Sequence, residues 1–143
     1  MSSRKKILIL NGPNLNLLGI RDQSIYGTLT LDEIIQALKD AFKEHSIIHY
    51  QSNHEGELID LLHKYGFEAD GIILNAGAYT HTSIAIADAV RAIRSPVVEL
   101  HISDIYARES YRHSSYLKEC CQHHVIGKGT GGYAEAVKYL IEN

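Results

Sequence analysis

Residues 71–101 read GIILNAGAYTHTSIAIADAVRAIRSPVVELH, and this stretch decides the fold. Short apolar runs at 71–74 and 96–100 have the length expected of buried strands. Between these runs, Ile86, Val90 and Ile93 recur at the spacing of one helix face. A strand, a helix and a second strand in this order indicate a parallel βαβ unit, because parallel neighbours need a crossover connection.

The same alternation extends to both sides of this unit. Further apolar runs occupy 7–10, 47–50 and, more weakly, 124–126. Each of these runs is followed by a segment of helical period, and these segments begin at Leu31, Leu58 and Tyr133. The order βαβαβαβαβα predicts an α/β fold, a flavodoxin-like three-layer sandwich with a five-stranded parallel sheet.

Two of the predicted helices carry a start signal. Thr30 is followed by Glu33, and Ser52 by Glu55, at the spacing of a capping box. We therefore predict that Thr30 and Ser52, or Asn53 in place of Ser52, cap the helices that follow them. The sequence has only two prolines and no repeat, so we expect one domain spanning 1–143.

The composition excludes several partners. A formal net charge of -3 leaves no basic field for a phosphate backbone, so we expect no nucleic acid partner. The first apolar run is too short for a signal peptide or a spanning helix, so we expect no membrane association. Cys120 and Cys121 are neighbours and poorly placed for a structural disulfide, which favours a reducing compartment, the cytoplasm.

One connection is unusually long. Residues 11–29 (NGPNLNLLGIRDQSIYGTL) join the first strand to the first helix, whereas such loops usually run about two to six residues. Loops of this length are functional or disordered. The mixture of Asn, Gly, Arg and Tyr with apolar residues favours a lid that closes over a ligand, and a solvated linker is the alternative.

Polar residues follow most of the predicted strands, at the sheet edge where open α/β folds bind ligands. They are Asn11, Asn14, Gln51, Ser52, Asn53, Asn75, Glu99, His101, Ser103 and Asp104. Their convergence predicts a rim that binds a polar small molecule rich in hydroxyls or carrying a carboxylate. Turn chemistry alone is an alternative explanation for an asparagine after a strand.

Tyr26 and Arg21 on the long loop form a candidate catalytic pair. A free phenol ionises near pH 10, so a tyrosine that acts as a base needs cations nearby. Arg21 can supply one and Arg108 another, and the sequence does not decide which of them dominates. The alternative is that Tyr26 packs its ring on the domain surface and that Arg21 only keeps the loop hydrated.

Glu99, His101 and Ser103 alternate along a predicted strand and therefore share one face. A carboxylate beside an imidazole favours the protonated ring, which makes His101 a candidate proton donor. A histidine is more often structural, and the chain has nine of them.

Further candidates are charged. Arg108 and Arg112 lie on one face if their segment is helical, where they could hold an anion or pair with Glu109. His81 is expected to begin the third helix, with Asp88 two turns later on the same face. A lone acid in an amphipathic helix usually points to water, which is the alternative for Asp88.

Motifs for other chemistries are missing. GKGTGG at 127–132 does not match a phosphate-binding P-loop, and no G-x-G-x-x-G follows the first strand. The glycine-rich segment 127–132 is expected to form the turn between the last strand and the last helix, and binding of a phosphate is the alternative. The histidines lack the spacing of metal ligands. We therefore expect neither a metal nor a cofactor.

Four ordered blocks resemble one known family over essentially the whole chain. The blocks are NGPNLNLLGIR with IYG, QSNHEGELID, NAGAYTHTSIAIADA and ELHISDIYARESYR. They resemble the type II dehydroquinases, cofactor-free lyases of the shikimate pathway of aromatic amino-acid biosynthesis. The resemblance implies that 3-dehydroquinate loses water through an enolate to give 3-dehydroshikimate.

The resemblance also implies roles for individual residues. Tyr26 would accept the proton next to the ketone, and Arg21 would keep Tyr26 ionised. Asn14 would stabilise the enolate through a water. His101, oriented by Glu99, would protonate the departing hydroxyl.

Other residues would hold the substrate or complete the assembly. The substrate contacts implied by the resemblance are Asn75, His81, Ile102, Ser103 and Arg112. Asp88 would come from an adjacent subunit, because the family forms dodecamers built from trimers. The chain departs from the family pattern at Gln23, often Pro, and at Asp104, often Asn, which could place a negative charge beside the carboxylate site.

Two other classes of function are compatible with the fold. A flavodoxin-like module would bind a flavin, a phosphate or another small molecule without catalysis. A signalling domain of similar topology would need acidic residues after its first strands, where this chain has Asn11 and Asn14.

Overall fold

A computed structural model describes residues 3–143; Met1 and Ser2, which the predicted 1–143 domain includes, lie outside the described residues. Five parallel strands form one sheet in the order β2-β1-β3-β4-β5. The strands are β1 (Lys6–Asn11), β2 (Ser46–Gln51), β3 (Gly71–Asn75), β4 (Val97–His101) and β5 (His123–Ile126). The predicted α/β fold with a five-stranded parallel sheet is confirmed.

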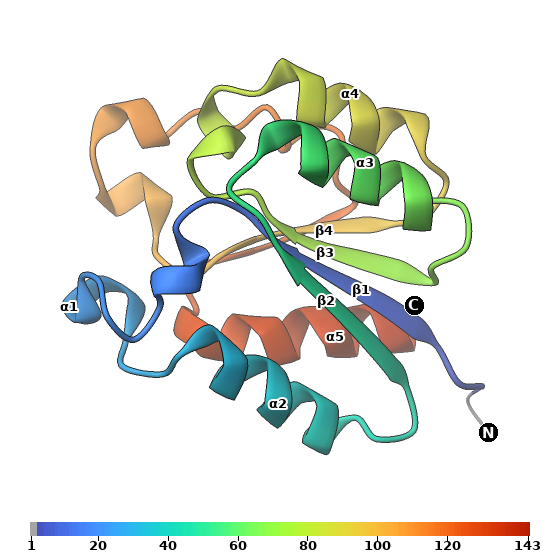
Figure 1. Cartoon of the computed structure of the whole chain (residues 1–143). Coiled ribbons are helices and arrows are strands. Elements are labelled where there is room, and N and C mark those ends of the chain that lie inside the picture. Colours follow the sequence, from blue (N-terminus) through green and yellow to red (C-terminus); the bar gives the residue numbers. More distant parts are fainter. Residues whose placement is uncertain (1–2) are drawn as a thin grey trace.

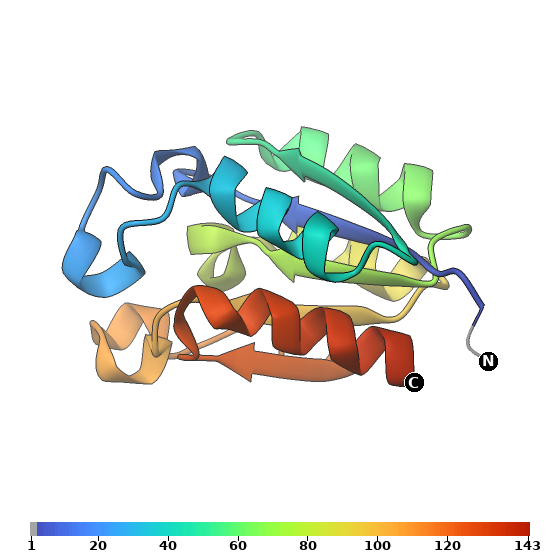
Figure 2. The same cartoon turned by 90° about the horizontal axis from the view of Figure 1, so that it is seen from below.

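Helices cover both faces of the sheet and make the three layers (Figures 1 and 2). The long helices are α2 (Leu31–Ala41), α3 (Glu55–Tyr65), α4 (Ile84–Ala92) and α5 (Gly132–Glu142). Successive strand residues point to opposite faces: Ile7 and Ile9 pack with α2 and α5, whereas Leu8 and Leu10 pack with α3 and α4. Each face therefore has its own apolar core. Among residues 3–143, no helix is long and apolar enough to cross a membrane.

The connecting segments at the carboxyl edge of the sheet contain short turns of helix (Figure 1). They are η1 (Leu15–Leu17), α1 (Gln23–Tyr26), η2 (Gly77–His81), η3 (Ile105–Ala107), η4 (Ser110–Arg112) and η5 (Gly129–Gly131). The 11–29 connection thus contains η1 and α1. Gly19, at a φ of 87°, lies against Thr28 and Leu29, so the middle of this loop packs against its C-terminal end. Closure of the loop over a ligand stays a prediction.

Two local predictions were wrong. Thr30 and Glu33 form the predicted capping box of α2. The predicted cap of α3 by Ser52 or Asn53 is wrong, because α3 begins at Glu55 with His54 at its N-cap. Ser52 Oγ instead accepts from the amide of His54, because a hydroxyl can satisfy a nearby turn as readily as a helix end.

The start of the third helix was also misplaced. His81 ends η2, and α4 begins after Ser83, whose hydroxyl accepts from the amide of Ile86. His81 and Asp88 therefore do not share a helix face. The serine, two residues further along, supplies the cap that His81 cannot.

Candidate active site

A pocket opens at the carboxyl edge of the sheet, where β1 and β3 run side by side. The chain passes from β1 to β2 on one side and then to β3 on the other, and such a reversal leaves a crevice between the two diverging loops. Asn11 pairs with Asn75 across this point. The lining residues are Pro13, Asn14, Leu15, Arg21, Tyr26, Asn75, Gly77, Ala78, His81, His101, Ile102, Ser103, Ile105, Arg108 and Arg112.

Gly12 allows the two loops to approach each other. Its amide donates to Asn75 O at 2.7 Å, and a Cβ at this position would lie 2.6 Å from Ala76 O. Only glycine fits so close to a neighbouring backbone. The loops that follow β1 and β3 thereby form one wall of the pocket.

Tyr26 lies between two guanidinium groups. Arg108 Nη1 donates to Tyr26 Oη at 2.7 Å, and Arg21 Nη2 lies 3.4 Å from the same oxygen. Both guanidinium carbons also lie over the ring, 5.5 Å and 4.6 Å from its centroid. The phenol oxygen thus has two positively charged groups beside it. The sequence left open which arginine dominates, and the shorter hydrogen bond is the one from Arg108.

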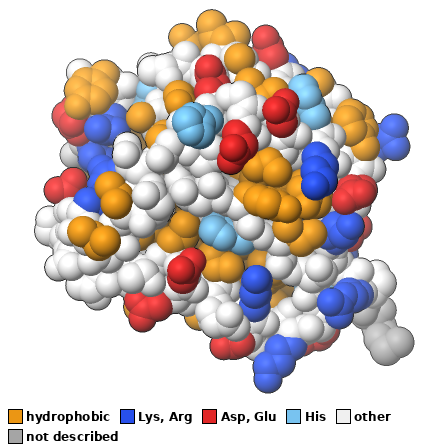
Figure 3. All heavy atoms as spheres, in the orientation of Figure 1, with side chains coloured by type: hydrophobic (Ala, Val, Ile, Leu, Met, Phe, Trp, Pro, Cys, Tyr) orange, Lys and Arg blue, Asp and Glu red, His pale blue; other side chains and the backbone are white. Residues whose placement is uncertain are grey.

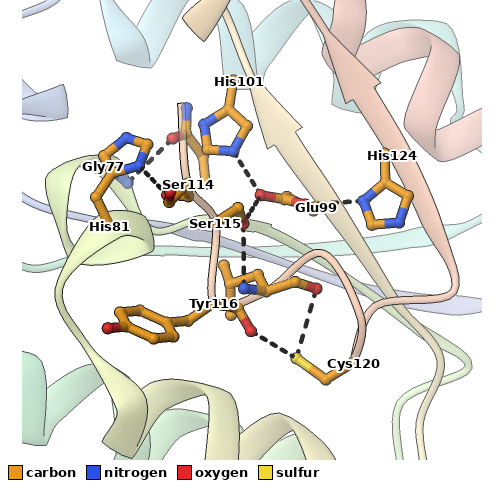
Figure 4. Close-up of polar contacts among 11 residues, drawn as sticks. Gly77, His81, Glu99, His101, Ser114, Ser115, Tyr116, Cys120 and His124 are labelled. Carbon is orange, nitrogen blue, oxygen red and sulfur yellow. Dashed lines mark hydrogen bonds and ion pairs between the residues drawn. The ribbon is translucent and has the colours of Figure 1, made fainter. Parts of the chain in front are cut away.

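His101 lines the pocket with little exposure, and Glu99 holds its ring (Figure 4). Its Nε2 lies 2.8 Å from Glu99 Oε2. A carboxylate only accepts, so Nε2 carries a hydrogen and Nδ1 remains the nitrogen for the pocket. The strand places both side chains on one face, as predicted.

Glu99 has two further partners that sequence analysis missed. Ser115 Oγ donates to Oε2 at 2.6 Å, and His124 Nδ1 lies 2.8 Å from Oε1 (Figure 4). Burial alone would raise the pKa of Glu99, but the hydrogen bonds from His101, Ser115 and His124 lower it to about 2. Glu99 is therefore an anion at neutral pH.

His81 lies beside His101, with the ring centroids 6.3 Å apart and nearly parallel. Its Nδ1 is 2.7 Å from Ser114 O (Figure 4), so Nδ1 carries the hydrogen and Nε2 is an acceptor. Burial lowers the pKa of His81, and the hydrogen bond to Ser114 offsets this effect only in part. A neutral His81 is suited to accept a hydrogen bond from a hydroxyl.

The pocket is rich in positive charge. Arg21, Arg108 and Arg112 all line it, and Figure 3 shows Lys and Arg side chains gathered over the segment of η3 and η4. Arg112 Nε donates to Glu109 Oε1 at 3.1 Å, and Arg108 Nε lies 3.7 Å from the same oxygen. The predicted pairing with Glu109 is therefore present, whereas the binding of an anion by these arginines stays a prediction. The segment forms two short turns and not one helix.

Most of the predicted site residues meet in this pocket. Those that line it are Asn14, Arg21, Tyr26, Asn75, His81, His101, Ile102, Ser103, Arg108 and Arg112. Asp88 does not: on α4 its side chain is 72% exposed, and Oδ1 lies 3.8 Å from Arg91 Nη1.

Other rim residues serve local structure. Asp104 Oδ1 accepts from the amide of Tyr106 and caps η3, so Asp104 is not among the lining residues. Asn53 Oδ1 accepts from the amide of Asn14 and does not cap α3. Gln23 Nε2 donates to Gly19 O at 2.7 Å within the 11–29 loop.

The described residues contain no group of three or more His, Cys, Asp or Glu side chains placed to hold a metal ion. The functional groups of the lining residues are a phenol, a serine hydroxyl, imidazoles, amides and guanidinium groups. This set can transfer protons and bind oxygen atoms of an anion.

Comparison with known proteins gives one consistent result. The sequence model of the family described as Dehydroquinase class II matches residues 5–141. A 3-dehydroquinate dehydratase of Exiguobacterium sp. is 51% identical over 139 residues, 96% of this chain and 95% of the relative. A protein of Aspergillus flavus named catabolic 3-dehydroquinase 2 is 45% identical, covering 96% of this chain and 93% of its own length.

Solved structures agree with the sequence comparison. The type II dehydroquinase of Butyrivibrio crossotus superposes with a TM-score of 0.92 at 40% identity, covering 96% of this chain and 97% of its own. That of Propionibacterium acnes has a TM-score of 0.93 at 34% identity, with both chains covered completely.

Proposed function

This chain belongs to the class II dehydroquinase family, and we propose that it removes water from 3-dehydroquinate to give 3-dehydroshikimate, a step of the shikimate pathway. The observation that carries the proposal is one pocket that holds both Tyr26, between two guanidinium groups, and His101, backed by Glu99. The elimination needs a base and an acid, because one proton leaves carbon and another must reach the departing hydroxyl.

The proposed reaction has two proton transfers. The phenolate oxygen of Tyr26 takes the proton next to the ketone, and the electron pair of the broken C–H bond passes to the ketone oxygen as an enolate. Asn14 stabilises the enolate through a water. The enolate then re-forms the ketone, a C=C bond forms, and the C–O bond breaks as His101 Nδ1 gives its proton to the hydroxyl. Each transfer contributes roughly 10² to 10⁴ in rate.

The remaining pocket residues hold the substrate in this proposal. Asn75 and the backbone amides of Ile102 and Ser103 bind the carboxylate region, and the three arginines attract its charge. His81 accepts from a ring hydroxyl through Nε2, and Arg112 reaches another. Arg21 also stabilises the negative charge of the transition state.

A homo-oligomer completes the site in the same proposal. The exposed Asp88 reaches the pocket of an adjacent subunit, within a dodecamer built from trimers. The enzyme works in the cytoplasm, where the two free thiols of Cys120 and Cys121 stay reduced. A noncatalytic flavodoxin-like binding module is not favoured, since the full-length relatives are named as dehydratases.

The test is direct. Purified protein is mixed with 3-dehydroquinate, without added metal or cofactor, and the ultraviolet absorbance of the conjugated enone product is followed. We expect the absorbance to rise in proportion to enzyme concentration, and we expect borohydride not to inactivate the enzyme with substrate present. No rise in absorbance, or irreversible inactivation by borohydride, would contradict the proposal.

A further inference from the structure

A chain of hydrogen bonds connects the pocket residues Asn75 and Gly77 with buried side chains that do not line the pocket. Its centre is Tyr133, a fully buried tyrosine of α5. Asn75 Nδ2 donates to Tyr133 Oη at 3.2 Å, and Tyr133 Oη donates to Asn11 Oδ1. Asn11 Nδ2 lies 3.0 Å from His49 Nε2, and the amide of Gly77 donates to Asn75 Oδ1 at 3.2 Å.

In each of these bonds the donor lies on the Gly77 side and the acceptor on the His49 side. The amide of Gly77 can only donate, so it requires the oxygen of the Asn75 side chain on its side. Tyr133 has one hydroxyl hydrogen and gives it to Asn11, so it can only accept from Asn75. A flipped Asn75 would place two donors together at Gly77 and two acceptors together at Tyr133. The orientation of the Asn75 amide is therefore fixed from both sides.

Burial keeps the hydroxyl of Tyr133 in the form that this chain needs. Transfer of a phenolate out of water is unfavourable, so burial raises the pKa of Tyr133 far above its ordinary value, an effect only partly offset by the bond from Asn75. The hydroxyl keeps its hydrogen and continues to donate to Asn11.

We propose that Tyr133 is a positioning residue for substrate binding, which holds the Asn75 amide in the one orientation that presents its remaining hydrogen-bonding capacity to the pocket. The inference rests on the proposed function, in which Asn75 binds the carboxylate region of 3-dehydroquinate. Neither Tyr133 nor Asn11 lines the pocket, so their effect passes through Asn75.

The first test is Tyr133→Phe, which keeps the buried ring and removes only the hydroxyl. We expect KM for 3-dehydroquinate to rise about 5- to 10-fold, the effect of one net hydrogen bond, with kcat changed less than about 3-fold. Tyr65→Phe is the matched control: this buried tyrosine bonds to Tyr50 Oη at 3.0 Å and does not line the pocket. We expect the control to lose stability without a change in KM.

A double-mutant cycle separates positioning from a general loss of structure. In an Asn75→Ala background, Tyr133→Phe should leave KM unchanged, because its target is gone. If Tyr133→Phe does not fold, Asn11→Ala serves instead, since it frees the hydroxyl hydrogen of Tyr133 to turn towards Asn75 and should also raise KM only when Asn75 is present.

Three outcomes would overturn the inference: an unchanged KM in Tyr133→Phe, the same rise in both backgrounds, or a loss confined to kcat. The wild-type assay keeps the two proposals distinguishable. If the wild type does not dehydrate 3-dehydroquinate, the proposed function fails. If the wild type is active and Tyr133→Phe has the same KM as the wild type, only the positioning role fails.

Discussion

Tyr26 and Tyr133 carry the same phenol in opposite surroundings. Tyr133 is fully buried in the apolar core, and its hydroxyl contacts the side-chain amides of Asn75 and Asn11. Within residues 3–143, no guanidinium bonds to this hydroxyl. Tyr26 is half-buried, and Arg108 and Arg21 both direct N–H groups to its oxygen. Burial raises the pKa of the Tyr133 phenol and keeps it neutral. In the two proposals, Tyr133 therefore orients a neighbour, whereas Tyr26, held beside two cations, accepts a proton.

Removing either guanidinium should weaken the base. We expect Arg108→Gln and Arg21→Gln each to lower kcat by about 10- to 100-fold, because a charge-assisted hydrogen bond contributes about 1.5–3 kcal/mol. Steady-state kinetics with 3-dehydroquinate measures this, with the exposed Arg94→Gln as control. A kcat within about 3-fold of the wild type in both arginine variants would contradict the role.

Glu99 should stabilise the fold in a pH-dependent way. Its pKa is lowered from 4.5 to about 2, which corresponds to roughly 3 kcal/mol at about 1.4 kcal/mol per pH unit. Because the folded value lies below the unfolded one, this contribution is complete above about pH 4.5 and is lost as the pH falls towards 2. Glu99→Gln should therefore lower the free energy of unfolding most at pH 7, and less at about pH 3.

Urea unfolding of the wild type and of Glu99→Gln at both pH values checks this expectation. Glu68→Gln, which changes an exposed glutamate that is paired with Lys6, is the control. A difference between the wild type and Glu99→Gln that does not depend on pH would show that the charge of Glu99 is not what stabilises the fold.

At the scale of secondary structure, periodicity predicted the strands well. The runs at 7–10 and 71–74 lie inside β1 and β3, because strands buried on both faces must be continuously apolar. The run at 47–50 lies inside β2, an edge strand that is only partly buried. Local capping was predicted correctly at Thr30 and wrongly at Ser52. A serine can bond to a turn or to a helix end, and only the path of the chain decides between them.

The capping box of α2 should contribute measurably to stability. Thr30 Oγ1 accepts from the amide of Glu33 at 3.2 Å, and Glu33 Oε1 accepts from the amide of Thr30 at 3.0 Å. We expect Thr30→Ala to lower the free energy of unfolding by about 1 kcal/mol, and Thr30→Ser to lower it much less, because serine keeps the hydroxyl. Equal stability of the two variants in urea would show that the cap is not responsible.

At the scale of the whole molecule, the site joins segments that are distant in sequence. The parallel sheet brings the carboxyl ends of β1, β3 and β4 to one edge. Four residues of the predicted polar rim therefore line one pocket: Asn14, Asn75, His101 and Ser103. The partners of Glu99 could not be predicted in this way. Ser115 comes from an irregular segment and His124 from the edge strand, and their approach depends on packing that no local pattern encodes.

The exposed Asp88 allows a test of the proposed assembly. If Asp88 acts in the site of an adjacent subunit, Asp88→Asn and Tyr26→Phe should each be nearly inactive alone. Mixed oligomers from co-expression should regain activity, because some sites then combine an intact Tyr26 with an intact Asp88 from the neighbour. Activity of the isolated mixed oligomers, measured against each variant alone, checks this. Failure of mixed oligomers to regain activity would place Asp88 outside the neighbouring site.

The central claim is that Tyr26 removes the proton, and Tyr26→Phe tests it most directly. The variant keeps the ring and loses only the oxygen, so 3-dehydroquinate should still bind in calorimetry while kcat falls by at least about 100-fold. Tyr106→Phe, an exposed tyrosine outside the pocket, should keep full turnover. A Tyr26→Phe enzyme that binds 3-dehydroquinate and retains most of its turnover would contradict the account.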